Sequence, residues 1–174
     1  MNKASALRRR TDLAKLHELQ AKLPRVLEII EVTGNPPRSF KLRIRIATAM
    51  NANYPQQKQE VNEVEIVLPE SYPFPPGPEV RFTTPIWNPN VYPSKKWCFG
   101  NWNITETLEF FVERLMKVIA LDPTIINEHS PANPEAANWY VLLKGRQPKL
   151  FPTVSLAGLM AQNKEPKIAW RPIK

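Results

Sequence analysis

The chain has 174 residues and a mass of 20.0 kDa, the size of one ordinary domain. Its hydrophobic content of 43% and charged content of 23% are average for globular proteins and exclude a disordered, collagen-like or low-complexity protein. Because Cys98 is the only cysteine, a disulfide framework and a cysteine-rich zinc module are excluded as well. No apolar run reaches the length of a membrane span and no secretory signal is recognisable, so we expect a cytoplasmic protein without a membrane partner.

The formal net charge of +8 is concentrated at the two ends of the chain. Residues 1–25 carry seven Lys and Arg against two acidic residues, and residues 144–174 carry seven against one. Residues 26–143 carry ten against thirteen, so the centre is mildly acidic. A basic protein ordinarily suggests nucleic acid as a partner, but this distribution and the lack of a base-stacking motif argue against it.

Residues 5–23 are predicted to form the first helix. Ser5 is the candidate cap, and leucines recur on one side at near-helical spacing, at Leu13, Leu16, Leu19 and Leu23. Pro24 then ends the helix, because it has no N–H to donate and its ring clashes with the preceding turn.

Four strands are expected next. A β-rich run covers residues 26–32, and strict alternation of apolar and polar residues covers 40–46 and, after a polar loop at 51–60, 64–68. Residues 79–82 are long enough for a fourth, short strand. Since these strands follow one another with short connections, they predict an antiparallel meander with one face on a core.

The segment 83–104 has neither helical nor strand periodicity, yet it carries Cys98 and three tryptophans, at Trp87, Trp97 and Trp102. A long irregular segment inside a compact domain is usually functional or disordered, and the aromatic content argues against disorder. The tryptophans could form a docking surface beside the cysteine. Filling of core volume is the interpretation we favour, especially for Trp87 and Trp102.

Helical patterns return after this segment. Apolar side chains in residues 108–119 recur at spacings of three and four, with Asn103 or Thr105 as the candidate cap. A further helix begins with Asn133 as its cap, continues into a proline at the first helical position, and stops at Gly145.

The C-terminal part is expected to contain a short helix at residues 154–161 and a basic tail over the last dozen residues. No internal repeat or second domain is recognisable. The order of elements predicts an α+β fold: an N-terminal helix, a four-stranded antiparallel meander, a cysteine-bearing irregular segment and C-terminal helices. Helices grouped before and after the strands exclude a doubly wound sheet.

Short motifs follow one another from the end of the third strand to the last helices. Residues 72–76 read Tyr-Pro-Phe-Pro-Pro, residues 88–90 read Asn-Pro-Asn, and Cys98 lies ten residues after Asn88. Trp102, Asp122-Pro123 and Pro134-Glu135-Ala136 continue the series. In this order the motifs resemble the ubiquitin-conjugating enzymes, the carriers that hold ubiquitin-like proteins as thioesters. The family pattern is Tyr-Pro-Phe-x-Pro-Pro, a strand, then His-Pro-Asn with the catalytic cysteine ten residues after the histidine.

The resemblance covers roughly residues 5–145 and implies the fold of this family. It assigns residues 1–150 to a ubiquitin-conjugating-like catalytic domain and residues 151–174 to a basic C-terminal extension that packs on the domain or trails from it. No metal ion or organic cofactor is implied, since ATP is consumed by the activating enzyme.

Three departures from the family pattern indicate a divergent member, with a bacterial ubiquitin-like conjugation system as its suggested source. Asn88 replaces the histidine that braces the local loop in the family, so the brace must be an amide or be absent. The stretch between Cys98 and Trp102 is about four residues shorter than in the family. About three residues are added before Pro134, so the acidic residue that often flanks the family's site has no counterpart, and Ser130 takes its place.

The resemblance implies that Cys98 accepts a ubiquitin-like protein from an activating enzyme and passes it to a lysine of a target protein. At its ordinary pKa only a few per cent of a thiol is ionised at pH 7, which suffices because the incoming partner is already a thioester. Asn90 is the candidate donor to the oxyanion, a role worth on the order of 3 kcal/mol. Its alternative role is that of a turn former, and we interpret Asn88 as structural.

Glu128, His129 and Ser130 are candidates for orienting or deprotonating the incoming lysine, which must lose its proton before it attacks. The alternative is a solvated loop between two helices. His129 also allows a rival hypothesis, a cysteine hydrolase dyad of Cys98 and His129, although no nucleophile signature of that kind is present.

The basic residues of the first helix, Arg8, Arg9, Arg10 and Lys15, resemble the face with which the family binds its activating enzyme. A solvated basic helix is the alternative. Two other functions stay open: a catalytically silent relative that only binds ubiquitin-like proteins, and a basic nucleic-acid-binding module in which Cys98 is incidental. Strand charges argue against the second, because Lys41, Arg43 and Arg45 are matched by nearby acidic residues.

Overall fold

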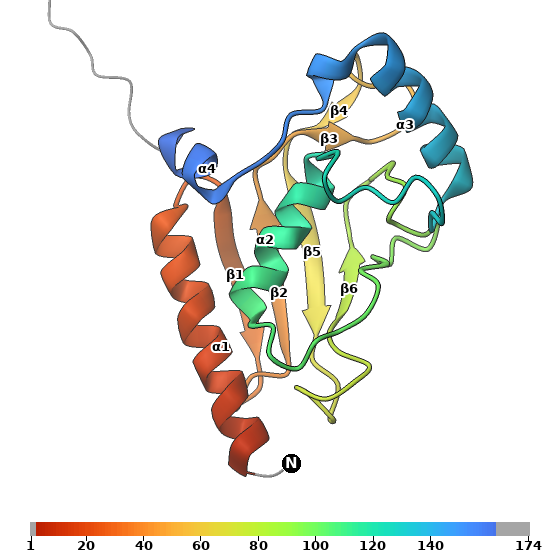
Figure 1. The fold of residues 1–174 in the computed structure, drawn as a ribbon. Helices are drawn as coiled ribbons and strands as arrows, with labels where there is room; N and C mark the ends of the chain where they lie inside the picture. Colours follow the sequence, from red (N-terminus) through yellow and green to blue (C-terminus); the bar gives the residue numbers. More distant parts are fainter. Residues whose placement is uncertain (1–2, 163–174) are drawn as a thin grey trace, which may run out of the picture.

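The structure, a computed structural model, describes residues 3–162 and has the predicted α+β architecture (Figure 1). The sheet is antiparallel with the strand order β1-β2-β5-β6. Its strands are β1 (Leu27–Thr33), β2 (Ser39–Ile44), β5 (Asn62–Val67) and β6 (Glu79–Phe82). The helices are α1 (Lys3–Lys22), α2 (Leu108–Ile119), α3 (Pro134–Arg146) and α4 (Leu156–Gln162), with a short 3-10 helix η1 (Pro148–Leu150).

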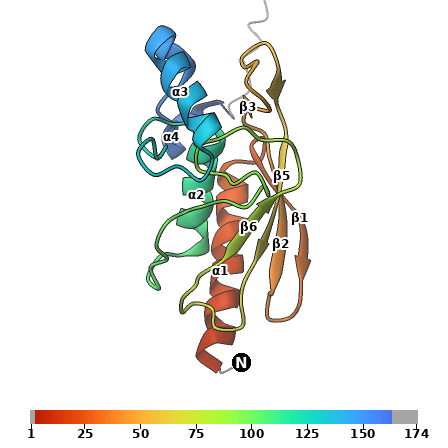
Figure 2. The ribbon, with the colours of Figure 1, turned by 90° about the vertical axis from the view of Figure 1, so that its right-hand side faces the viewer.

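The main core lies between the sheet and the helices α1 and α2, which cover one of its faces (Figure 2). The predicted alternation places apolar side chains on this face, and they meet across the strands in the register Phe40 with Ile66 and Leu42 with Val64. From α1 the leucines Leu16 and Leu19 complete the layer, as their spacing predicts. Opposite-charge pairs lie on the other face, where Arg43 contacts Glu63 at 2.7 Å.

A small hairpin whose second strand falls in the predicted polar loop was not predicted. Its strands β3 (Thr48–Ala49) and β4 (Lys58–Gln59) are two residues long, too short to carry an alternating pattern. The hairpin packs against α3 and η1 in a second hydrophobic cluster. Its buried members are Ala49, Leu121, Ile126, Tyr140 and Phe151.

Two predicted helix starts are wrong. Ser5 lies inside α1, where its buried hydroxyl donates a hydrogen bond to the carbonyl of Tyr72 at 2.5 Å instead of capping the helix. The cap of α2 is Thr107 rather than Asn103 or Thr105, because the Asn103 carboxamide accepts bonds from Thr105 in a separate turn. The first N–H of α2, on Leu108, is bound instead by a side chain of α1.

The C-terminal helices follow the prediction closely. Asn133 caps α3 by accepting a bond from the N–H of Ala136 at 3.1 Å, and α4 covers most of the expected short helix. Leu159 of α4 is buried in the main core, and the N–H of Val154 donates to the buried carboxylate of Asp122 at 2.7 Å. Within residues 3–162 no helix has the length and apolar character needed to cross a membrane. The expected basic tail lies outside the described residues.

Candidate functional site

A tight hairpin brings Asn90 and Cys98 side by side. The N–H of Cys98 donates to the carbonyl of Asn90 at 2.8 Å, and the N–H of Tyr92 donates to the carbonyl of Lys96 at 2.9 Å. Lys95 at the tip takes a positive φ of 66°, which closes the turn. The spacing of ten positions from Asn88 to Cys98 thus matches a hairpin that returns the cysteine to the Asn-Pro-Asn motif.

Cys98 is half-buried and lines an open pocket of about 220 Å³. Asn90, Gly100, Arg114 and Asn127 line the same pocket. The pocket therefore joins the hairpin, the start of the shortened segment, α2 and the loop that follows α2.

The hydroxyl of Tyr92 donates a hydrogen bond to the sulfur of Cys98 at 3.6 Å. This bond is the main reason why the pKa of Tyr92 is raised above its ordinary value, since it favours the protonated phenol. No motif in the sequence singles out Tyr92. A signal was available, because pairing Asn90 with Cys98 across a hairpin also brings residue 92 close to residue 98.

Asn88 is fully buried and supplies the brace that the histidine provides in the family pattern. Its Nδ2 donates to the carbonyl of Val118 in α2 at 2.7 Å, and its Oδ1 accepts from the N–H of Asn90 at 2.8 Å. The prediction of a structural role for Asn88 is confirmed, and the brace is an amide.

Asn90 is 6% exposed, and both ends of its side chain already bind the loop after α2. Its Nδ2 donates to the carbonyl of Ile125 at 3.0 Å, and its Oδ1 accepts from the N–H of Asn127 at 2.8 Å. An amide nitrogen carries two hydrogens, so one donor remains beyond the bond to Ile125. Asn90 therefore holds the wall of the pocket beside Cys98 and keeps a donor for a second acceptor.

The loop residues predicted to serve an incoming amine do not line the Cys98 pocket. His129 and Ser130 are exposed, and the side chain of Asn127 accepts bonds from both of their N–H groups. Glu128 turns away toward α3, where it forms an ion pair with Lys144. Among the described residues, the side chain that bonds to the Cys98 thiol is Tyr92. The structure therefore does not pair Cys98 with His129 as a dyad.

The three tryptophans pack into hydrophobic clusters, as we expected from the favoured interpretation. Trp97 is buried against Phe111, with ring centroids 4.8 Å apart, and Trp87 packs on the second cluster. Trp102 donates from its indole to the carbonyl of Pro73 at 2.7 Å. It also packs on Gly77, where an added Cβ would lie 2.4 Å from the ring, so only glycine fits there.

Arg114 of α2 holds the shortened segment after the cysteine. Its guanidinium donates to the carbonyl of Phe99 and to the carboxylate of Glu106, both at 2.8 Å, and lies over the ring of Trp97. The residue after Cys98 is therefore fixed to α2 by a charge-assisted bond. Arg114, like Tyr92, was not identified from the sequence, because its role depends on a contact across 15 residues.

A family model described as ubiquitin-conjugating enzyme matches residues 13–147, most of the chain. The chain belongs to the ubiquitin-conjugating enzyme family. The resemblance inferred from the ordered motifs is thereby confirmed, and the hairpin that carries Asn90 and Cys98 lies inside the matched range.

Individual members of the family match parts of the chain. Ubiquitin-conjugating enzyme E2 T of Bos taurus is 29% identical over 122 residues, which cover 66% of this chain and 57% of that protein. Ubiquitin-conjugating enzyme E2 7 of Triticum aestivum is 33% identical over 86 residues, 40% of this chain and 48% of that protein. E2 T of Mus musculus is 49% identical over 47 residues, 27% of this chain and 22% of its own length. The aligned parts thus span less than two thirds of these relatives.

Among solved structures, Ubc12 of S. cerevisiae superimposes with a TM-score of 0.58. The match covers 82% of this chain and 72% of that chain at 20% sequence identity. At this level of identity the similarity establishes the fold alone, and it agrees with the α+β architecture described above.

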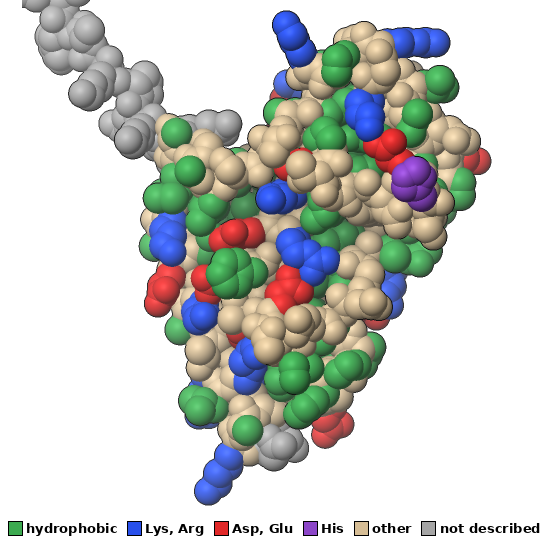
Figure 3. Space-filling view, viewed as in Figure 1, with side chains coloured by type: hydrophobic (Ala, Val, Ile, Leu, Met, Phe, Trp, Pro, Cys, Tyr) green, Lys and Arg blue, Asp and Glu red, His purple; other side chains and the backbone are tan. Residues whose placement is uncertain are grey.

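The predicted basic face of α1 is not a single exposed surface in this ubiquitin-conjugating enzyme relative. Arg9 is 2% exposed and donates to the carbonyls of Pro37 and Pro69, so its assignment to an exposed face is wrong. Lys15 is half-buried and pairs with Glu109 at 3.7 Å, whereas Arg10 is exposed. Figure 3 shows Lys and Arg side chains interspersed with Asp and Glu over α1 and α2 rather than gathered in one basic patch.

Arg8 belongs to a polar cluster between α1 and the segment that precedes α2. Its Nε donates to the carboxylate of Asp12 at 2.7 Å, and its other nitrogens donate to the carbonyls of Ile104 and Glu106. The Tyr72 hydroxyl donates to the same carboxylate at 2.6 Å. Burial, together with the nearby Asp12 charge, raises the pKa of Tyr72 far above its ordinary value, so the phenol stays protonated and acts as a donor. Arg8 therefore fixes α1 to the segment before α2.

Within residues 3–162 no group of three or more His, Cys, Asp or Glu side chains could hold a metal ion.

Proposed function

We propose that this protein is a transferase that carries a ubiquitin-like protein as a thioester on Cys98. Membership of the ubiquitin-conjugating enzyme family supports the proposal. The observation that carries it is the hairpin geometry, which pairs the main chains of Cys98 and Asn90 and presents a half-buried thiol in an open pocket that Asn90 also lines. A cysteine sealed in the core would not fit this role, because the sulfur must reach the carbonyl of a second protein.

In the first step the Cys98 thiolate attacks the thioester carbonyl that links a ubiquitin-like protein to an activating enzyme. A carbon–sulfur bond forms to Cys98, the bond to the cysteine of the activating enzyme breaks, and that sulfur leaves as a thiolate. The Tyr92 hydroxyl supports this step, since its hydrogen bond to the sulfur stabilises the thiolate. The reaction exchanges one thioester for another and needs no cofactor.

In the second step a deprotonated lysine amine of a target attacks the Cys98 thioester. Negative charge develops on the carbonyl oxygen, and the remaining donor of the Asn90 amide is available to stabilise it. The carbon–sulfur bond then breaks, an amide forms, Cys98 leaves as a thiolate, and the amine proton passes to solvent. Ser130 and His129 lie on the loop that Asn90 and Asn127 hold, so we propose that this loop contacts the incoming target.

The charging reaction tests the proposal. The full chain is incubated with an activating enzyme, its ubiquitin-like protein and ATP, and the products are separated on a non-reducing gel. We expect an adduct that reductant removes, that C98A abolishes, and that S94A, a change at an exposed position of the same hairpin, leaves intact. If the activating enzyme forms its own thioester but the chain never does, the transferase proposal is wrong and a relative that only binds ubiquitin-like proteins takes its place.

A further inference from the structure

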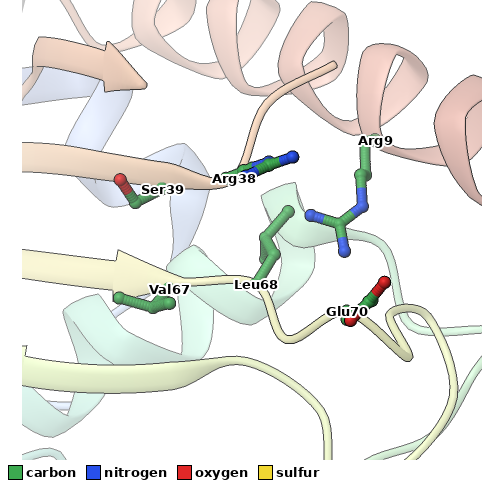
Figure 4. A pocket seen from close by; sticks show the side chains of 6 residues that line it. All are labelled: Arg9, Arg38, Ser39, Val67, Leu68 and Glu70. Atoms are coloured by element: carbon green, nitrogen blue, oxygen red, sulfur yellow. The ribbon is translucent and has the colours of Figure 1, made fainter. Parts of the chain in front are cut away.

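A pocket of about 530 Å³ lies where α1 meets the loops at one end of the sheet (Figure 4). Arg9 reaches into it from α1, Arg38 enters from the start of β2, and Glu70 lies on the loop after β5. Val67 and Leu68 form an apolar part of the wall. None of these residues lines the pocket that contains Cys98.

Arg9 is a buried cation whose charge is not neutralised. Two of its N–H groups donate to the carbonyls of Pro37 and Pro69, its Nε–H has no partner, and the ring of Tyr72 lies 5.6 Å from the guanidinium carbon. No carboxylate among residues 3–162 forms an ion pair with it. Buried charged groups in proteins are normally paired, because the loss of hydration is costly, so the absence of a counter-ion at this position calls for an explanation.

Arg38 adds a second positive charge to the same pocket. Burial is the main cause that lowers the pKa of Arg9; Tyr72 opposes it, the like charge of Arg38 lowers the pKa further, and Glu70 has the smallest opposing effect. In Figure 4 both guanidinium groups point into the same space between α1 and the sheet. Arg38 is exposed and forms no ion pair with the described residues, so it too is available to an anion.

We propose that this pocket binds an oxyanion, a carboxylate or a phosphate, between Arg9 and Arg38. Five N–H donors in a planar fork let a guanidinium bind two oxygens of such a group at once, and Arg9 uses only two of its donors on carbonyls. The volume lies in the range of small-molecule sites, and the apolar wall offers a surface to the carbon skeleton of the ligand. Glu70 provides one negative charge in this pocket for two guanidinium groups, and the anion supplies the second.

The proposal is independent of the thioester chemistry, since it involves no residue of the Cys98 pocket. It predicts that ligand binding stabilises the folded chain, because an anion that binds the native pocket favours the native state. It also predicts that Cys98→Ala leaves anion binding unchanged.

The experiment is an NMR titration of the full chain at constant ionic strength, with sodium chloride replaced stepwise by inorganic phosphate, by citrate, or by a short peptide rich in Asp and Glu. The Nε–H signal of Arg9 is followed. We expect saturable shifts with at least one probe, an affinity about tenfold weaker in R38Q, and a change of less than twofold in R10Q. R10Q is the matched control, because it removes the same charge from an exposed position on the same helix.

The three probes distinguish the sources of the anion. Saturation by phosphate or citrate identifies a small free ligand, and saturation by the peptide alone identifies carboxylates that a partner protein carries; both support the proposal. Shifts that never saturate, or that R38Q and R10Q reduce equally, would overturn it, since they would reflect general charge screening. The test uses a variant of the exposed Arg38 because substitution of the buried Arg9 could prevent folding.

Discussion

Two polar clusters, each built around buried side chains, join distant parts of this chain, and they differ in the groups that form them. The ionic cluster under α1 consists of Arg8, Asp12 and Tyr72. The amide cluster beside Cys98 consists of Asn88, Asn90 and Asn127. The first fixes α1 to the start of α2, and the second fixes the cysteine hairpin to the loop after α2.

The difference has a physical consequence. Each member of the ionic cluster depends on the others, because removing one leaves a charge or a phenol without its partner in a buried place. The amides carry no charge and do not titrate. The part of the Cys98 pocket wall that the amides hold therefore does not change its charge at the alkaline pH values at which a lysine loses its proton, as the proposed transfer to an amine requires.

The largest effect is expected from Asp12→Ala. The carboxylate accepts from Arg8, Tyr72 and the N–H of Leu108, and its loss removes the counter-charge of Arg8 and the acceptor of the other two donors. We expect the free energy of unfolding to fall by about 3 kcal/mol, measured by urea denaturation. T11A is the matched control, a change at the adjacent exposed position of α1. A loss smaller than that of N90A would contradict the ranking of the two clusters.

Asn90→Ala should have the next largest effect. Loss of the bonds to Ile125 and Asn127 is expected to lower the free energy of unfolding by about 2 kcal/mol. Charging of Cys98 should persist, and discharge to free lysine should slow about a hundredfold if the amide also stabilises the oxyanion.

Two variants separate these roles of Asn90. Asn127→Ala removes the side-chain bonds that order the loop at residues 127–130, but it leaves the Asn90 amide and its bonds to the main chain of Ile125 and Asn127 in place. Asn101→Ala changes an exposed amide outside the pocket. If N127A slows discharge as much as N90A does, order in the loop rather than a bond from Asn90 to the oxyanion explains the slowing. We expect N101A to discharge at the unmodified rate.

The smallest effects are expected at the Tyr92–Cys98 contact, which lies outside both clusters. In C98A the pKa of Tyr92 should fall back toward about 10, because the bond that favours the protonated phenol is lost. In Y92F the thiolate loses its donor, and alkylation of Cys98 at pH 7 should slow about two- to threefold. Carbon-13 NMR of the tyrosine rings and a timed alkylation assay measure the two changes. An unchanged Tyr92 titration in C98A would mean that the contact does not form in solution.

Local patterns were sufficient for the elements and their order. Alternation identified β2 and β5, and the leucine spacing identified the buried side of α1, because burial on one face imposes a period on the sequence. The Asn133 cap and the short α4 were also predicted, since capping depends on a few neighbouring residues. The hairpin β3–β4 was missed because two-residue strands carry no period.

By itself, the sequence determined the fold class, the family and the placement of Cys98 ten residues after Asn88, because these depend on short-range order along the chain. Only the tertiary structure decided the partners of the polar side chains. In it Arg9 is buried beside Arg38, and the Asp12 carboxylate accepts a hydrogen bond from the first N–H of α2. It also used the Asn90 amide to hold the loop after α2. These pairs of residues are 29 to 96 positions apart, and no local period or propensity encodes them.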